Sequence, residues 1–283
     1  MALVQHAPRL GDLAANVEWA VATVRAEAAR GEDLVVFPEL SLCGYLLKDL
    51  VPETALRLDG PEIAELVEAV GSASAVLGAV VESRTHRFYN AAILISDGGV
   101  RHVHRKVYLP TYGMFDEQRY LAAGDRFETV DLPVAGGQSW RIGILICEDL
   151  WHPSSPYLLS RAGADLIICT SASPGRGIGA GPKGLGTAAI WGAMASAYAS
   201  AFTTYLAFCN RVGFEDGLYF WGGSRVVGPD GCLQQEVAGD ESTVVHAELD
   251  RGLLRRVRIA YPLLRDERED VVRRQLEVRP DEL

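Results

Sequence analysis

The chain has 283 residues, 48% of them hydrophobic, and a formal net charge of −10 at pH 7. This length can bury a sizeable core, and an acidic chain without a basic run argues against nucleic acid as a partner. Five widely spaced cysteines without a CxxC pair are typical of a reduced cytoplasmic protein. Because no signal-peptide pattern or membrane-length apolar run is present either, we expect a cytoplasmic protein without a membrane partner.

The first half of the chain alternates between helical and strand patterns. Apolar residues recur at helical spacing over residues 11–30. Asp33 to Phe37 form a short buried strand that Pro38 ends, with a carboxylate just beyond it. A helix that opens with proline is predicted over residues 61–70. Further strands are predicted over residues 75–82, 89–96 and 100–106.

The second half begins with a segment, residues 107–125, that is rich in Tyr, Phe, Pro and Gly and predicts an ordered loop. Long loops in compact domains are often functional. A second loop is predicted over residues 171–186, which contain six glycines and two prolines. Helices are predicted over residues 157–162 and 187–201, and strands over residues 140–147, 165–169, 203–209, 223–227 and 243–249.

The order of these elements predicts the fold class. Helices and strands alternate early and hairpin-like strands follow, which indicates an α/β layered sandwich with mixed β-sheets. We expect a single domain over residues 1–283. Residues 255–283 are crowded with Arg, Asp and Glu, so we expect a C-terminal extension that is solvated or contacts a partner subunit.

The most informative stretch is the apolar run that leads to Cys147, after which Glu148, Asp149 and Trp151 follow. In open α/β sheets the reactive groups lie where strands end. Cys147 is therefore a candidate nucleophile on the turn that leaves a buried strand. A lone cysteine in this position is more often a structural core residue, so the interpretation depends on its partners.

Two other strand ends supply such partners. Glu39 follows an apolar strand, where burial would raise the pKa of a carboxylate and suit it to general-base catalysis. Lys106, one of three lysines in the chain, ends a strand before the aromatic loop and could stabilise an oxyanion. Taken singly, Glu39 could instead be a helix N-terminal carboxylate and Lys106 a surface charge.

Together these segments resemble the three signatures of the nitrilase (carbon–nitrogen hydrolase) superfamily, in the family's order and at its usual separations. The segments are Phe37-Pro38-Glu39-Leu40, Arg105-Lys106-Val107-Tyr108-Leu109-Pro110 and Ile146-Cys147-Glu148-Asp149-Leu150-Trp151, with Ser171-Ala172-Ser173-Pro174 and Trp221-Gly222-Gly223-Ser224 as further landmarks. The resemblance spans essentially the whole chain. It implies a four-layer αββα sandwich, a homodimer or higher homo-oligomer, and catalysis without a metal or an organic cofactor.

The resemblance also implies residue roles. Glu39 would be the general base, Cys147 the nucleophile that forms a thioester, and Lys106 the stabiliser of the tetrahedral intermediate. The family often places a second glutamate ahead of an aromatic residue and a Gly-Asp pair, and Glu117 matches that pattern. The plainer interpretation of Glu117 is a solvated loop carboxylate.

The branch of the family is indicated by Tyr108 to Glu117 and by the residues after Cys147, which are most similar to the glutaminase domain of glutamine-dependent NAD synthetase and to related free-standing amidases. In that relative the residues matching Tyr112, Glu148 and Ser173 help to seat glutamine. True nitrilases usually carry tryptophan directly after the cysteine, so Glu148 favours amides over nitriles. Arg176 could pair with a substrate carboxylate or lie on the surface.

The sequence therefore predicts a cysteine-dependent amidohydrolase that converts a small carboxamide to an acid and ammonia. A glutaminase subunit that supplies ammonia to a separate synthetase is an alternative, because no Ser-Gly-Gly-x-Asp-Ser signature is present. Two further alternatives are a nitrilase and a catalytically silent dimeric scaffold. The sequence does not predict a metal site, because it has no cluster of His and Cys ligands. His102 and His104 share a strand face, but no other ligand lies nearby in the sequence.

Overall fold

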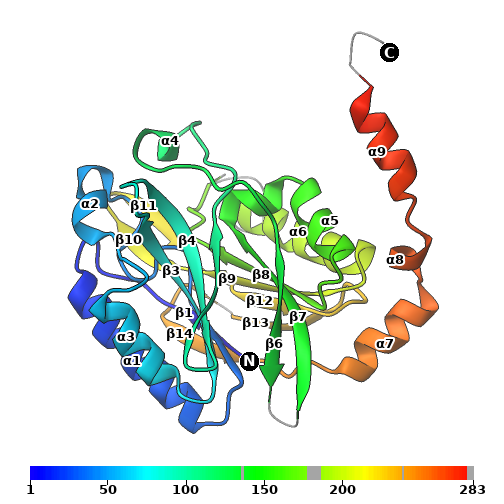
Figure 1. The fold of residues 1–283 in the computed structure, drawn as a ribbon, viewed down its shortest axis with the longest axis horizontal. Helices are drawn as coiled ribbons and strands as arrows, with labels where there is room; N and C mark the ends of the chain where they lie inside the picture. The colour runs from blue at the N-terminus through cyan, green and yellow to red at the C-terminus, as the bar shows by residue number, and fades with distance from the viewer. Residues whose placement is uncertain (135–136, 177–185, 238, 279–283) are drawn as a thin grey trace.

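The computed structural model describes residues 1–134, 137–176, 186–237 and 239–278 (Figure 1). Within these residues two six-stranded sheets pack face to face, in the orders β14-β1-β2-β3-β4-β5 and β13-β12-β9-β8-β7-β6. Both sheets are mixed, because each contains parallel and antiparallel neighbours. A separate hairpin is formed by β10 and β11.

The first sheet is made of β1 (Ala2–Gln5), β2 (Leu34–Val36), β3 (Ser74–Glu82), β4 (Phe88–Ser96), β5 (Gly99–Arg105) and β14 (Thr243–His246). The second is made of β6 (Thr129–Val134), β7 (Gln138–Ile146), β8 (Leu166–Ser171), β9 (Tyr205–Asn210), β12 (Arg225–Val227) and β13 (Leu233–Glu236). The hairpin strands are β10 (Val212–Glu215) and β11 (Leu218–Trp221).

Helices cover the outer faces of both sheets, which gives the four-layer αββα arrangement (Figure 1). The helices are α1 (Leu13–Ala29), α2 (Val51–Thr54), α3 (Pro61–Val70), α4 (Glu117–Tyr120), α5 (Ser154–Arg161), α6 (Gly186–Ala201), α7 (Arg251–Ala260), α8 (Leu263–Asp266) and α9 (Glu269–Glu277), with short 3₁₀ turns η1 (Lys48–Leu50) and η2 (Cys147–Trp151). Helices α1 and α3 pack on the first sheet, and α5 and α6 on the second.

The two-residue period of the strands divides the core between these layers. Leu34 and Val36 of β2 belong to the cluster that also contains Ile144 of β7, between the sheets. Val35, which lies between them in sequence, packs instead with the α1 and α3 layer. Successive side chains of a strand point to opposite faces, so a strand covered on both sides is apolar throughout. This pattern is why the apolar runs were recognisable in the sequence.

The structure confirms the predicted α/β class and the helix over residues 61–70, and it adds strands that the sequence did not predict. These are β1, β6, β10, β11 and β13. The aromatic segment, residues 107–125, contains only the short helix α4. Most of the predicted loop over residues 171–186 falls on residues 177–185, which lie outside the described residues.

The C-terminal residues, predicted as a solvated or partner-contacting extension, form helices over most of their described length. Helix α7 packs on the body through Leu254 and Val257, whereas α9 buries none of its residues. Residues between α7 and α9 still contact α5, because Arg161 bonds Leu264 O and Glu269 and the Tyr157 hydroxyl donates to Glu267. The part that stands away from the body is α9 beyond Glu269 (Figure 1). In the described part of the chain, no helix combines the length and apolar character needed to cross a membrane.

Candidate active site

Strand ends of both sheets bring the predicted catalytic residues together. Glu39 follows β2, Lys106 follows β5, and Cys147 follows β7. The two sheets meet at this edge, because the backbone N–H of Ala172, just after β8, donates to Glu39 Oε2 at 2.7 Å. The edge thus collects a carboxylate, an ammonium and a thiol in the buried interior.

Glu39 is held by a close approach between its turn and β3. Gly78 of β3 has no side chain, and a Cβ atom there would lie 2.4 Å from both Leu40 N and Pro38 O. The turn is fixed further by a hydrogen bond from Leu42 N to Gly78 O at 3.0 Å. Glycine is therefore required at this position for the Glu39 turn to lie against the sheet.

Lys106 bridges two carboxylates. Its Nζ donates to Glu39 Oε1 and to Glu117 Oε1, both at 2.7 Å, and Asn90 Nδ2 donates to the same Glu39 oxygen at 2.7 Å. Burial alone would lower the pKa of Lys106, but the carboxylates of Glu117 and Glu39 together hold it well above its usual value. Lys106 is therefore a permanent cation within this cluster.

Glu117 differs from Glu39 in its surroundings. One oxygen accepts from Lys106 and from the Tyr45 hydroxyl, at 2.5 Å for the latter, whereas Oε2 is buried without a hydrogen-bond partner among the described residues. An apolar hollow of about 140 Å³ lies beside it, lined in part by Val51, Val80 and Phe115. Burial, opposed by Lys106 and reinforced by Glu39, raises the pKa of Glu117 to about 7. Glu117 can therefore bind or release a proton near neutral pH.

Cys147 opens the turn η2 with a φ of 45°, in the left-handed region that non-glycine residues rarely adopt. Its Sγ accepts a hydrogen bond from the Ser171 hydroxyl at 3.3 Å. Burial and the Glu39 carboxylate raise the pKa of the thiol well above its usual value, and Lys106 opposes them. In this state Cys147 is a thiol that needs a base before it can act as a nucleophile.

A buried carboxylate two residues further on holds the cysteine turn against the strand end that bears Lys106. Asp149 is fully buried, and its Oδ1 accepts from Val107 N at 3.1 Å and from Tyr108 N at 3.0 Å. Its Oδ2 accepts from Ile146 N at 3.0 Å and lies 2.9 Å from His104 Nε2. Asp149 thereby joins the two sheets next to the site.

Three of the four predicted substrate-binding residues, Tyr112, Glu148 and Arg176, contact one another, and the Tyr112 side chain is exposed. The Tyr112 hydroxyl donates to both oxygens of Glu148, at 3.1 and 2.9 Å. Burial and this carboxylate raise the pKa of Tyr112 to about 12. The Arg176 guanidinium lies over the rings of Phe115 and Tyr112, 4.6 and 5.9 Å from their centres, and its Nη2 is buried without a partner among the described residues.

Ser173 is the exception, because it lies deeper than the other three. Its Oγ accepts from Trp191 Nε1 at 2.8 Å and from Trp221 Nε1 at 3.5 Å. Its backbone N–H donates to Asn210 Oδ1 at 2.9 Å. These contacts assign Ser173 a structural role beside the site, and its hydroxyl hydrogen has no acceptor among the described residues.

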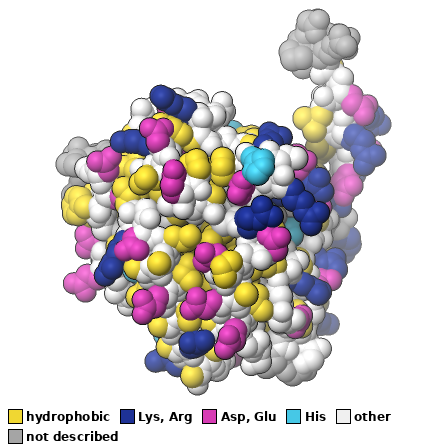
Figure 2. All heavy atoms as spheres, turned by 60° about the vertical axis from the view of Figure 1, so that its left-hand side comes forward, with side chains coloured by type: hydrophobic (Ala, Val, Ile, Leu, Met, Phe, Trp, Pro, Cys, Tyr) yellow, Lys and Arg dark blue, Asp and Glu magenta, His cyan; other side chains and the backbone are white. Residues whose placement is uncertain are grey.

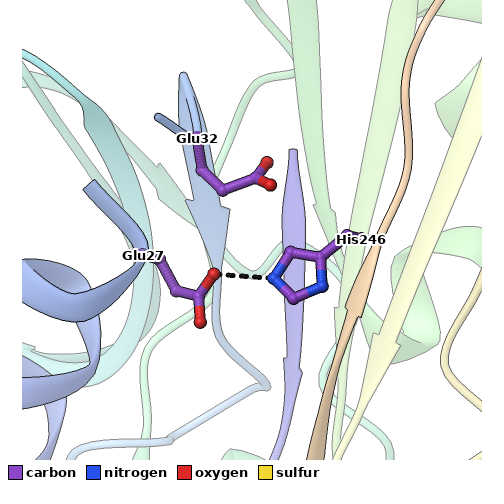
Figure 3. Close-up of side chains that lie close together, drawn as sticks. All are labelled: Glu27, Glu32 and His246. Carbon is purple, nitrogen blue, oxygen red and sulfur yellow. Dashed lines mark hydrogen bonds and ion pairs between the residues drawn. The ribbon is translucent and has the colours of Figure 1, made fainter. Parts of the chain in front are cut away.

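A second cluster of titratable groups, Glu27, Glu32 and His246, lies at the opposite end of β2 (Figure 3). Its three side chains are close enough to share a metal ion. However, His246 Nε2 lies 2.7 Å from Glu27, and the Met1 ammonium lies 2.8 Å from Glu32. Because these charges are already paired within the protein, we assign the cluster a structural role.

Comparison with known proteins identifies the family of this chain. The family model described as carbon-nitrogen hydrolase matches residues 1–259. The chain belongs to the carbon–nitrogen hydrolase family. The glutamine-dependent NAD(+) synthetase of Thermotoga maritima is 33% identical over 264 residues, which cover 92% of this hydrolase chain and 43% of the synthetase. The (R)-stereoselective amidase of a Pseudomonas species is 33% identical over 272 residues, 94% of this chain and 90% of the amidase.

The chain thus spans less than half of the synthetase and nearly all of the amidase. Among solved structures, the carbon–nitrogen hydrolase from Helicobacter pylori G27 superposes with a TM-score of 0.81 at 24% identity, covering 98% of this chain and 97% of that one. This likeness concerns the fold, and it agrees with the αββα sandwich described above.

The sequence did not single out four residues that the structure places in the site: Tyr45, Asn90, Asp149 and Ser171. Asp149 and Ser171 lie inside the quoted motifs, so their position beside reactive groups was a usable signal. Asn90 is a polar residue within a buried apolar strand, which is another. No comparable signal marks Tyr45.

Proposed function

We propose that the chain is a cysteine-dependent amidohydrolase that cleaves a small carboxamide to a carboxylic acid and ammonia through a thioester on Cys147. The observation that carries the proposal is the buried cluster in which Lys106 bridges Glu39 and Glu117 close to a thiol. Nucleophilic catalysis needs a thiol, a base for its proton and a cation for the charge that develops. The cluster contains each of these groups.

In the first half-reaction Glu39 takes the thiol proton and Sγ attacks the amide carbonyl carbon. Lys106 stabilises the oxyanion of the tetrahedral intermediate. The C–N bond then breaks, the proton on Glu39 passes to the leaving nitrogen, and ammonia departs from an acyl-Cys147 thioester. In the second half, Glu39 takes a proton from water, the water oxygen attacks the thioester, and the acid and the free thiol are released. The net reaction consumes one amide and one water.

Glu117 supports this chemistry as the second carboxyl group. Its Oε2 has no hydrogen-bond partner among the described residues, and its pKa of about 7 leaves it partly protonated near neutral pH. We assign it to hold the amide nitrogen of the substrate. A buried polar atom without a partner costs free energy unless a bound molecule satisfies it, which is consistent with this role.

The substrate class is indicated by the predicted substrate-binding residues. Glu148 and Arg176 bring a negative and a positive group into contact with Tyr112, and Nη2 of Arg176 has no hydrogen-bond partner among the described residues. We propose that Tyr112, Glu148, Arg176 and the hydroxyl of Ser173 bind a small amide with polar substituents. Glutamine is one such molecule, because its ammonium and carboxylate could pair with Glu148 and Arg176.

A glutaminase subunit that passes ammonia to a separate synthetase is the second candidate. It is favoured by the similarity to the Thermotoga maritima synthetase, of which the chain spans 43%. The similarity to the Pseudomonas amidase favours a free-standing enzyme. A nitrilase is less favoured because Glu148 follows the cysteine. A silent scaffold would have no need of two carboxylates and an ammonium buried beside a thiol.

Ammonia release tests the proposal. The substrates are glutamine, asparagine, simple aliphatic and aromatic amides, and the matched nitriles, with Cys147→Ala as the blank. Preference for glutamine favours the ammonia-supplying subunit, and turnover of simple amides favours the free-standing amidase. Turnover of nitriles over amides contradicts the amidase assignment. No turnover of any compound, or equal turnover by the Cys147→Ala protein, contradicts the proposed function.

We further propose that residues 1–283 form one hydrolase domain that assembles as a homodimer, and that residues 255–283 contact the second copy. Helix α9 leaves Leu276 82% exposed and buries no residue on its own chain. Helix α9, called the arm below, carries interspersed acidic and basic side chains and projects from the body (Figure 2). Val271 and Leu276, both exposed on α9, are the apolar side chains that a second copy could cover.

The mass in solution tests this arrangement. A chain that ends at Arg265 should lose the dimer, and Leu276→Asp should weaken it while keeping the chain length. An unchanged mass for both variants contradicts the arm contact. For the cell we propose a cytoplasmic location, which the five free thiols support.

A further inference from the structure

Ser171 reaches the sulfur of Cys147 because of the register between two parallel strands. Ile146 at the end of β7 pairs with Thr170 of β8, so the next residues, Cys147 and Ser171, leave neighbouring strands at the same edge. Ser171 is fully buried, and its hydroxyl donates to Cys147 Sγ at 3.3 Å. Among the described residues, no other side chain donates a hydrogen bond to this sulfur.

We propose that Ser171 is a further catalytic residue of this hydrolase, whose hydroxyl stabilises the Cys147 thiolate when Glu39 removes the thiol proton. The catalytic part of this inference rests on the proposed function. The stabilisation of the thiolate does not, and it can be measured without a substrate.

The surroundings of the sulfur explain why such a donor is needed. Burial and the negative charge of Glu39 both disfavour a thiolate, and the Lys106 ammonium is shared between two carboxylates. Among the described residues, the other titratable groups that interact with the thiol bring no further cation; they are Tyr45, Tyr112 and Cys169. The neighbouring groups Glu117, Glu148 and Asp149 are acidic. A neutral hydroxyl stabilises the anion by donating a hydrogen bond and does not compete for the proton.

The backbone around Ser171 is held in the sheet, and it connects Cys147, the proposed nucleophile, with Glu39, the proposed base. Ser171 pairs with Asn210 of β9, and its carbonyl accepts from Arg211 N at 3.1 Å. The next residue, Ala172, donates its N–H to Glu39 Oε2 at 2.7 Å. Two consecutive residues therefore contact both reactive groups. Ser171 binds the Cys147 thiol through its side chain, and Ala172 binds the Glu39 carboxylate through its backbone. This preorganisation is what a proton transfer from sulfur to oxygen requires.

The test is the pH dependence of alkylation of Cys147 by iodoacetamide, in which a C–S bond forms and iodide leaves. A Cys232→Ser background removes the exposed thiol, and peptide mass spectrometry follows Cys147 alone. Ser171→Ala removes the hydroxyl and Ser171→Thr retains it. Ser155→Ala is the matched control, because that serine is also fully buried but its hydroxyl has no partner among the described residues. Melting curves and circular dichroism verify that each variant folds.

We expect Ser171→Ala to raise the apparent pKa of alkylation by about one unit, which makes the reaction about tenfold slower at pH 7. The limiting rate at high pH should stay within about twofold of the parent protein, since both then react as full thiolates. Ser171→Thr should restore the parent profile if it folds, and Ser155→Ala should match the parent. An unchanged profile for folded Ser171→Ala overturns the inference, as does an equal loss of rate at every pH.

Amide turnover separates this inference from the proposed function. If Ser171→Ala shifts the alkylation profile but the parent protein hydrolyses no amide, the thiolate contact stands and the proposed function fails. If the parent hydrolyses amides and Ser171→Ala does so with unchanged kcat and KM across the pH range, the proposed function stands and the catalytic role of Ser171 is refuted.

Discussion

Replacing Glu117 by glutamine should change how the stability of the protein depends on pH. The pKa of Glu117 rises from its ordinary value of 4.5 to about 7 because burial and the Glu39 carboxylate disfavour the charged form. Folding therefore favours the protonated carboxyl. At about 1.4 kcal/mol per pKa unit, its contribution amounts to about 3 kcal/mol, complete below pH 4.5 and lost as the pH rises through 7.

The Glu117→Gln protein has no proton to lose at this position. Relative to it, the wild-type protein should lose about 3 kcal/mol of unfolding free energy between about pH 5 and pH 8. Urea denaturation followed by tryptophan fluorescence at fixed protein concentration measures this difference. Glu65→Gln, on an exposed position of α3, is the control and should track the wild type. If the wild-type and Glu117→Gln curves run parallel across this range, the proposed burial of a protonated carboxyl is refuted.

Three further changes probe the surroundings of the site. Tyr45→Phe removes the phenol that donates to Glu117 at 2.5 Å, so the stability loss attributed to Glu117 should move to higher pH in the same urea series. Gly78→Ala should lower the free energy of unfolding by about 1–3 kcal/mol and lower kcat more than it changes KM, because the new Cβ would press on the Glu39 turn. The control Gly99→Ala places its Cβ in open space and should change neither stability nor kcat. Asp149→Asn should lower the unfolding free energy by about 3 kcal/mol, because an amide replaces one of two acceptor oxygens, and unchanged urea midpoints would contradict this.

Strand ends are the part of the site that the sequence could predict. The runs of β2 and β7 are apolar on both faces and visible without knowledge of their neighbours; Glu39 lies three residues after the first, and Cys147 directly follows the second. Lys106 directly follows β5, a strand with polar and apolar residues. The partners of these residues are less visible, because they lie far away in the chain. Tyr45 and Glu117 are 72 residues apart, and Asn90 and Glu39 are 51 apart. Their proximity follows from sheet order, which no local pattern encodes.

The missed strands have separate physical reasons. Strand β6 contains Pro133, which normally argues against a strand, but β6 lies at the edge of its sheet, where a missing N–H is tolerated. The hairpin β10–β11 turns at Asp216-Gly217, a recognisable hairpin signal that could have been used. Strand β13 is exposed throughout, so its sequence lacks an apolar pattern and only its pairing with β12 makes it a strand.

The C-terminal residues illustrate the limit of composition as a guide. Their high charge correctly indicates that little of the segment is buried, because none of the residues of α9 is buried. It did not indicate helices, since charged residues with good helix propensity fit a solvated helix as well as a disordered tail. Leu254 and Val257 dock α7 onto the body, and their spacing of three residues was the available signal.

Trapping the thioester on Cys147 tests the central claim most directly. The protein is mixed with glutamine or with propionamide, quenched in acid during turnover, and digested for mass spectrometry. The account predicts that the peptide containing Cys147 gains the mass of the acyl group, that is, the amide less ammonia, and that Cys43, Cys169, Cys209 and Cys232 stay unmodified. Ammonia release at a steady rate without any acyl adduct on Cys147, and with equal activity in Cys147→Ala, would contradict it.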